Sequence, residues 1–195
     1  MNIKRNINKN TKKSLIFVCG LQTPKWAVEL LWKKYLIKNF PNYSIHIIGD
    51  CRYKFEDIET MKQLIQEVET LINDSSSTIL IGHSMGGILV SSLSKDVYNS
   101  NTIEKIITIN TPHSMNIQRE DILTINKIRE KLQYSNNYDT YIPTLTFGGY
   151  LDTTVPKKYT KTPNSKHVNL WFEHYILFYI SIFHIKKIIR LIKEL

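Results

Sequence analysis

The most regular feature of the chain is a series of short apolar runs that are bounded by polar residues, glycine or proline. Runs of this kind, rich in isoleucine, valine and leucine, are typical of strands buried on both faces of a sheet. We therefore predict strands at residues 14–20, 44–48, 78–81, 105–110, 143–149 and 167–171.

Between these runs, apolar residues recur at the spacing of a helix face. This spacing predicts helices at residues 25–39, 57–73, directly after residue 87, at about 119–133, and from about Glu173 to the end. The residues expected to face the core are Trp26, Ala27, Leu30 and Leu31 in the first helix and Ile58, Met61, Ile65, Val68 and Ile72 in the second.

Strands that alternate with helices indicate a doubly wound, mostly parallel α/β sheet of about six strands flanked by helices. We expect a single domain over residues 14–195, preceded by a flexible basic tail at residues 1–13. The segment from Thr111 to Pro143 is too short for a large cap domain, which predicts an open site or a small lid.

Composition narrows the function classes only slightly. The 195 residues carry a net charge of +9 that comes mainly from lysine, but no motif of a nucleic-acid-binding module accompanies it. The two cysteines, Cys19 and Cys51, suggest thiols in a reducing compartment. The N-terminal stretch lacks the apolar core of a secretion signal, so we expect a cytoplasmic protein.

One hexapeptide points to chemistry, Gly82-His83-Ser84-Met85-Gly86-Gly87, placed between a predicted strand and a predicted helix. This context is required by the G-x-S-x-G nucleophile elbow, which holds a serine at the tip of a sharp turn. Gly82 and Gly86 are needed because a Cβ at either position would clash where strand and helix approach each other. The first N–H groups of the helix would then surround the Ser84 hydroxyl and favour negative charge there.

With Gly20 ending an earlier strand and Asn110-Thr111-Pro112-His113 ending a later one, the chain resembles the α/β-hydrolase fold. The resemblance extends over about Leu15 to Leu195 and is nearest to the small lipase and esterase branch, which includes GPI-inositol-deacylase-like and bacterial lipase-like proteins. It implies a cofactor-free enzyme with a Ser-acid-His triad in this chain order. No metal-ligand spacing is present, and we expect neither a metal nor a cofactor.

The acid of the triad should follow Ser84. The later aspartates are Asp96, Asp121, Asp139 and Asp152. Asp152 comes just after a predicted strand, at the edge where open α/β sheets place their sites. The stretch Gly148–Pro156 also resembles the acid loop of lipase-like hydrolases, and Asp152 is the predicted acid.

The base should follow the acid, and three histidines do so. His174 lies between the last strand and the final helix, where the fold places its base, and it is the predicted base. His167, at the start of the last strand, remains the alternative, whereas His184 reads as an ordinary helix residue. His83 is expected to be structural, and His113, which precedes the acid, to line a pocket.

An oxyanion hole needs two backbone donors. The Met85 N–H is one by its place after the nucleophile, and Leu21, or else Gln22, is expected to supply the other from the loop after the first strand. Gln22 is also a possible pocket residue. Relatives usually have His-Gly in this loop, where this chain has Cys19-Gly20. Cys19 is expected to be an inert buried thiol.

We therefore predict a serine hydrolase of carboxylic esters that acts through an acyl-enzyme on a small-molecule or lipid ester. An acyltransferase or thioesterase with the same triad is an alternative, as is a non-catalytic binding protein that keeps the elbow as architecture. The apolar and basic C-terminal helix allows peripheral membrane contact. The protein would be a monomer or a homodimer.

Overall fold

The protein is described by a computed structural model in which residues 12–20, 23–49, 58–93, 102–114, 142–174 and 182–195 are placed. Its centre is a six-stranded sheet in which every neighbouring pair of strands is parallel. The strand order is β2-β1-β3-β4-β5-β6. The strands are β1 Lys13–Val18, β2 Tyr43–Ile48, β3 Ser77–His83, β4 Ile103–Ile109, β5 Thr144–Gly149 and β6 Lys166–Leu170.

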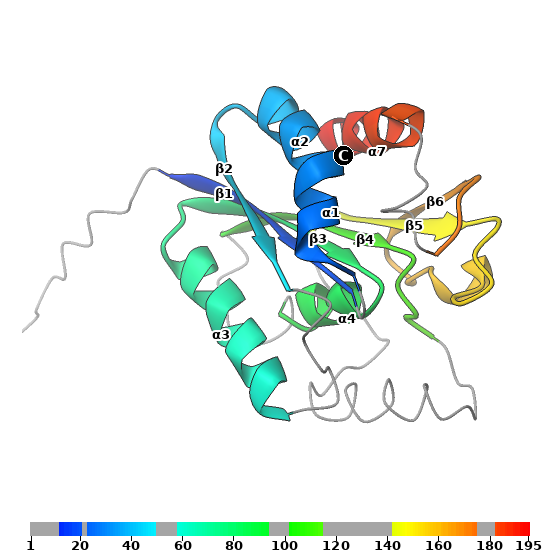
Figure 1. The fold of residues 1–195 in the computed structure, drawn as a ribbon, viewed down its shortest axis with the longest axis horizontal. Helices are drawn as coiled ribbons and strands as arrows, with labels where there is room; N and C mark the ends of the chain where they lie inside the picture. The colour runs from blue at the N-terminus through cyan, green and yellow to red at the C-terminus, as the bar shows by residue number, and fades with distance from the viewer. Residues whose placement is uncertain (1–11, 21–22, 50–57, 94–101, 115–141, 175–181) are drawn as a thin grey trace, which may run out of the picture.

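Helices cover both faces of this sheet (Figure 1). On one face lie α7 (Ile182–Glu194) and a continuous helical run made of α1 (Lys25–Val28), a π-helical turn (Glu29–Lys33) and α2 (Lys34–Asn39). On the other face lie α3 (Ile58–Asn73) and α4 (Met85–Ser92), and a short 3₁₀ turn (Lys157–Tyr159) follows β5. The predicted doubly wound parallel α/β sheet is confirmed.

The two faces of the sheet build two separate apolar cores. In β1, Leu15 and Phe17 pack with the helical layer that contains α2 and α7, whereas Ile16 and Val18 pack with α3 and α4. Successive side chains of a strand point to opposite faces, so a strand buried on both sides is apolar at every position. This explains why the inner strands appear in the sequence as apolar runs, whereas the edge strands β2 and β6, which are only partly buried, also carry polar residues.

The predicted core face of the first helix is confirmed only in part, because Ala27 is buried and Leu31 packs against the core, but the other two predicted residues do neither. Trp26 and Leu30 are exposed, whereas Val28, Trp32 and Leu36 are fully buried. Both sets recur every four residues, so the spacing alone could not distinguish them. A π-helical turn within the run also shifts the angular position of the residues that follow it.

The predicted start of the last helix is wrong. Glu173 and His174 are not helical, and the described helix α7 begins at Ile182. The main-chain carbonyls of Glu173 and His174 accept hydrogen bonds from side chains at the ends of β4 and β3. The predicted helix at 119–133 and most of the predicted lid segment lie outside the described residues.

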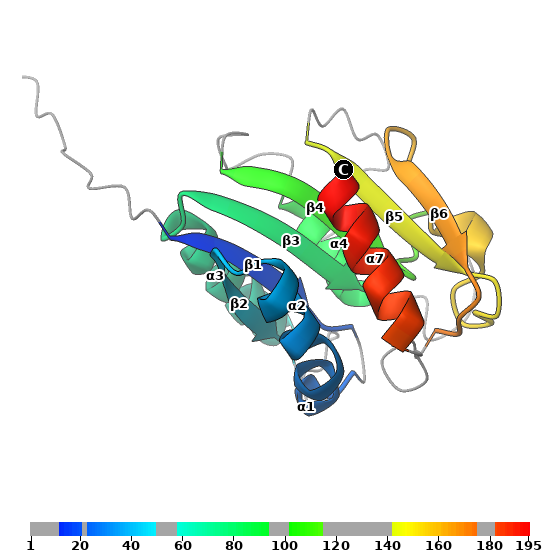
Figure 2. The same cartoon turned by 90° about the horizontal axis from the view of Figure 1, so that it is seen from above.

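Because all strands are parallel, their carboxyl ends meet at one edge of the sheet, the edge to which the arrows point in Figure 2. The loops after β3, β5 and β6 carry Ser84, Asp152 and His174 respectively. Residues separated by up to ninety positions in the chain are thereby brought to one place. Among the helices of the described residues, none is long and apolar enough to cross a membrane.

Candidate active site

Ser84 lies in a sharp turn between β3 and α4. Its backbone has φ 51° and ψ −121°, a conformation that residues other than glycine rarely adopt. The Ser84 N–H donates to the Ile109 carbonyl oxygen at 2.9 Å, and its own carbonyl accepts from the Gly87 N–H at 3.0 Å. These two hydrogen bonds hold the strained residue between β4 and the first turn of α4, as the elbow motif predicts.

The glycines of the elbow allow α4 to lie against the sheet. A Cβ on Gly82 would stand 2.5 Å from the Gly86 carbonyl oxygen. A Cβ on Gly86 would stand 2.6 Å from the Cys19 carbonyl oxygen and would also collide with that of Val18. The predicted steric need for glycine at both positions is confirmed.

We expect Gly86→Ala to lower the free energy of unfolding by about 3 kcal/mol or more, because the new methyl group meets backbone atoms that cannot rotate away. Urea unfolding followed by circular dichroism measures the effect. Ser92→Ala, at the end of the same helix, is the control and should cost no more than about 1 kcal/mol. Equal stability of the two variants would contradict the steric argument.

Ser84, His174 and Asp152 form a continuous chain of hydrogen bonds. His174 Nε2 lies 3.0 Å from Ser84 Oγ. On the other side of the ring, His174 Nδ1 lies 2.9 Å from Asp152 Oδ2. All three residues are buried, with exposed fractions of 5%, 7% and 5% for Ser84, His174 and Asp152.

Asp152 is held by its own loop. Its second carboxylate oxygen, Oδ1, accepts from the N–H of Thr154 at 2.9 Å and from the N–H of Val155 at 2.7 Å. Both carboxylate oxygens are therefore hydrogen-bonded, Oδ1 to the backbone and Oδ2 to the imidazole. Such an arrangement fixes the orientation of the carboxylate.

Two further side chains position the loop that carries His174, and sequence reasoning did not assign this role to either. His83 Nε2 donates to the His174 carbonyl oxygen at 2.9 Å. Asn110, with φ 48°, donates from Nδ2 to the Glu173 carbonyl oxygen at 3.0 Å and accepts at Oδ1 from the Gly149 N–H at 2.9 Å. Asn110 thus joins the loop of the histidine to the end of the strand that precedes the aspartate.

His83 is neutral in the folded protein. Burial, together with the neighbouring His174, lowers the pKa of His83 from 6.5 to about 3. Its Nε2 proton is held by the His174 carbonyl, and Nδ1 faces the Thr23 hydroxyl at 3.4 Å. The predicted structural role of His83 agrees with this environment.

This low pKa predicts a pH-dependent stability. The unfolded chain binds a proton at His83 near pH 6.5, whereas the folded protein does so only near pH 3. Between these values acidification favours the unfolded chain, by up to about 1.4 kcal/mol per pH unit from this residue, and above pH 6.5 its contribution is constant.

We expect His83→Gln to remove about that much from the slope of unfolding free energy against pH between pH 6 and pH 4. The glutamine amide can still donate to the His174 carbonyl, so stability at pH 7.5 should change little. Urea unfolding at several pH values measures both quantities. An unchanged slope would show that His83 is not the group that titrates.

The remaining candidate residues are distributed as follows. Met85 is buried as the first residue of α4, and Cys19 is buried at the end of β1. His167 lies on β6 and is hydrogen-bonded to Thr146 Oγ1 and Asn169 Oδ1, and burial lowers its pKa. His184 is within α7. Outside the described residues are Leu21, Gln22, Cys51, Asp96, Asp121 and Asp139.

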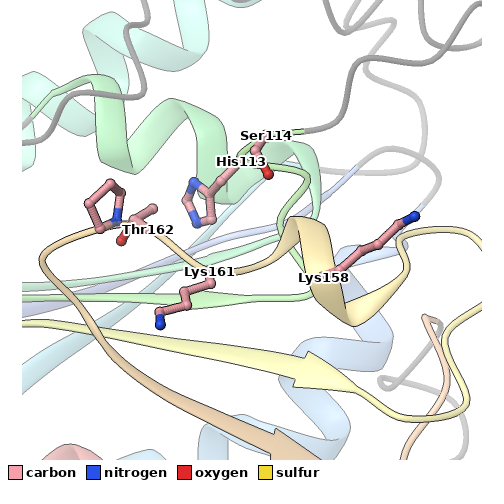
Figure 3. Close-up of a pocket in the computed structure, with 6 residues that line it drawn as sticks. His113, Ser114, Lys158, Lys161 and Thr162 are labelled. Atoms are coloured by element: carbon pink, nitrogen blue, oxygen red, sulfur yellow. The ribbon is translucent and has the colours of Figure 1, made fainter.

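His113 is buried, and its Nε2 lies 2.9 Å from Thr108 Oγ1. It lines a cavity of about 310 Å³ together with Ser114, Lys158, Lys161, Thr162 and Pro163 (Figure 3). None of these residues belongs to the Ser84-His174-Asp152 chain. Within the described residues, no group of three or more His, Cys, Asp or Glu side chains could hold a metal ion.

Comparison with known proteins identifies the family of this chain. The sequence model of the PGAP1-like alpha/beta domain family matches residues 46–184, a range that contains Ser84, Asp152 and His174. A GPI inositol-deacylase of Aspergillus terreus is 34% identical in an alignment of 98 residues that covers 44% of this chain and 8% of that protein. The chain thus matches less than a tenth of the length of its curated relatives.

Solved structures agree on the fold. A metagenome-derived lipolytic enzyme superposes with a TM-score of 0.66 at 11% identity and covers 95% of each chain. The enol-lactonase of Burkholderia xenovorans superposes with a TM-score of 0.65 at 12% identity, over 94% of this chain and 92% of that one. At such low identity these likenesses establish the fold alone.

Proposed function

The chain belongs to the PGAP1-like alpha/beta domain family, within the α/β-hydrolase superfamily, and we propose that it is a serine hydrolase of carboxylic esters. Ser84 would be the nucleophile, His174 the general base and Asp152 the residue that orients the base. The observation that carries this proposal is the unbroken chain from Ser84 Oγ to His174 Nε2 and from His174 Nδ1 to Asp152 Oδ2.

In the proposed reaction, the Ser84 hydroxyl attacks the ester carbonyl while its proton moves to His174 Nε2. A serine hydroxyl is a weak nucleophile near neutral pH, and an adjacent base removes this obstacle. The His174 Nδ1–H donates to Asp152. This hydrogen bond selects the tautomer in which Nε2 carries no proton, and it stabilises the imidazolium that forms. His174 then protonates the leaving alcohol, and water resolves the acyl-enzyme by the reverse sequence of proton transfers.

The tetrahedral intermediate carries a negative oxygen that needs donors. The Met85 N–H is at the N-terminus of α4, where backbone N–H groups lack intrahelical acceptors. We propose it as one oxyanion donor and the loop after β1, at Leu21 or Gln22, as the source of the second. The strained backbone of Ser84 supports this role, because it places the nucleophile and the following N–H on the same side of the turn.

The relatives support the reaction class. GPI inositol-deacylases are deacylases by name, and removal of an acyl group by water is the chemistry that a serine nucleophile with a histidine base performs. A carboxylic ester is the class that the site itself supports.

A fluorophosphonate probe tests the proposal, because it labels only serines that a nearby base activates. We expect one modified residue, Ser84, when the labelled protein is digested and analysed by mass spectrometry. Ser84→Ala and His174→Ala should both abolish the labelling, whereas Ser114→Ala, which replaces an exposed serine, should retain it. A folded protein that is not labelled would overturn the proposed triad and favour a binding protein with this fold.

A further inference from the structure

Large apolar side chains are exposed beside the candidate site. Trp171 and Phe183 are 68% and 69% exposed, and Tyr150 and Leu151 are 44% and 49% exposed. Leu151 precedes Asp152 directly, and Trp171 lies in the short segment that leads from β6 to His174. These four residues are called the apolar rim below.

Contacts within the rim hold it together. The ring of Tyr150 stacks on that of Trp171, with 4.9 Å between the centroids and 25° between the planes. The N–H groups of Tyr150 and Leu151 donate to the carbonyls of Leu170 and Phe172, at 2.8 and 3.2 Å. The loop of the aspartate and the segment before the histidine are thus joined, through their backbones and through the stacked rings of Tyr150 and Trp171.

Phe183 continues the rim from the first turn of α7. The centroid of the His184 ring lies 6.1 Å from that of Phe172 and 5.8 Å from that of Phe183. The first turn of α7 is therefore close to the segment that follows β6. In the same helical layer, α1 carries Trp26, which is 63% exposed. Figure 2 shows α1 and the start of α7 on the side to which the strand arrows point.

Lysines accompany these side chains. Lys157 Nζ lies 3.9 Å from the centroid of the Tyr150 ring, Lys158 follows it, Lys25 precedes Trp26, and Lys186 is exposed on the first turns of α7. The whole chain has a net charge of +9. Exposed tryptophan and tyrosine beside lysine are the combination that suits the boundary between lipid headgroups and acyl chains.

We propose that the apolar rim docks the protein on the surface of a membrane that contains anionic lipids, with the edge of the sheet that carries Ser84 facing the headgroups. The aromatic side chains enter the interface, and the lysines remain at the level of the phosphates. This docking goes beyond the proposed function because it requires no reaction at Ser84.

Vesicle cosedimentation tests this proposal. We would use vesicles of phosphatidylcholine with 30 mol% phosphatidylglycerol, vesicles of phosphatidylcholine alone, and protein carrying Ser84→Ala, so that the result is independent of catalysis. We expect binding to the anionic vesicles, weaker binding to the neutral ones, and a loss of binding at high salt. Failure of ester hydrolysis would leave this result unchanged, and failure of docking would leave the fluorophosphonate result unchanged.

The double substitution Trp171→Ser with Phe183→Ser should lower the partition coefficient about tenfold or more, since two aromatic side chains no longer enter the interface. Ile37→Ser is the matched control. Ile37 is 52% exposed, but it lies on α2 shortly before the amino end of β2, at the opposite edge of the sheet. Its replacement should leave vesicle binding unchanged, and an equal loss in both variants would overturn the proposal.

A measurement on the protein without these substitutions completes the test. Brominated phosphatidylcholine quenches tryptophans that enter the interface, so we expect quenching of the exposed Trp171 and Trp26 but not of Trp32, which is fully buried. Absence of quenching in a folded protein would contradict docking. A dimer whose dissociation follows the Trp171 and Phe183 substitutions, without vesicle binding, would instead assign the rim to a second copy of the chain.

Discussion

Replacing Ser84 by alanine, or His174 by alanine, is expected to lower kcat for a p-nitrophenyl ester by about a million-fold. The reason is that the two residues act as one unit, since the hydroxyl is nucleophilic only while His174 Nε2 accepts its proton at 3.0 Å. The double variant Ser84→Ala with His174→Ala should therefore be no slower than either single variant. Steady-state hydrolysis measures these rates, with the concentration of each variant taken from its absorbance.

Ser114→Ala is the control for this comparison, because Ser114 is an exposed serine that lines the cavity with His113 and is not part of the hydrogen-bonded chain. It should keep the rate of the unsubstituted protein. Two single variants whose losses multiply in the double variant would show that Ser84 and His174 contribute independently. That result would contradict the proton transfer on which the proposed mechanism depends.

The fold was predictable mainly because the inner strands of the sheet are buried on both faces. Alternate residues of β1 belong to two different apolar cores, which requires an apolar side chain at every position and makes the strand visible in the sequence. Helix faces were less predictable. In residues 25–39 more than one side of the helix carries apolar side chains, and periodicity cannot tell an exposed Trp26 from a buried Trp32.

The proposed docking also explains why apolar residues are exposed on that helix. Trp26 is solvent-accessible on α1, and Figure 2 shows α1 on the side to which the strand arrows point, which is the side of the proposed docking surface. Apolar residues that bind a surface outside the molecule follow the same spacing as core residues. Only the arrangement of the elements shows which of the two they are.

For the site, the chain order Ser-acid-His selected three residues that lie within hydrogen-bond distance in the structure, although their catalytic roles stay predictions. The positioning residues could not be selected in this way. Asn110 reaches the Glu173 carbonyl across 63 positions, and His83 reaches the His174 carbonyl across 91. Hydrogen bonds from a side chain to a distant backbone carbonyl have no sequence signature, because every residue carries that carbonyl.

Asp152→Asn is expected to lower kcat about ten-thousand-fold while the fold is retained. Oδ1 of Asp152 accepts from two backbone N–H groups, so the asparagine carbonyl oxygen should take that position and its NH₂ group should face His174. An NH₂ donor opposite His174 Nδ1 favours the tautomer with the proton on Nε2. That tautomer cannot accept the proton of Ser84, and circular dichroism should be unchanged while ester hydrolysis is lost. A variant of full activity would show that Asp152 does not set the tautomer of His174, and the proposed triad would then lack its acid.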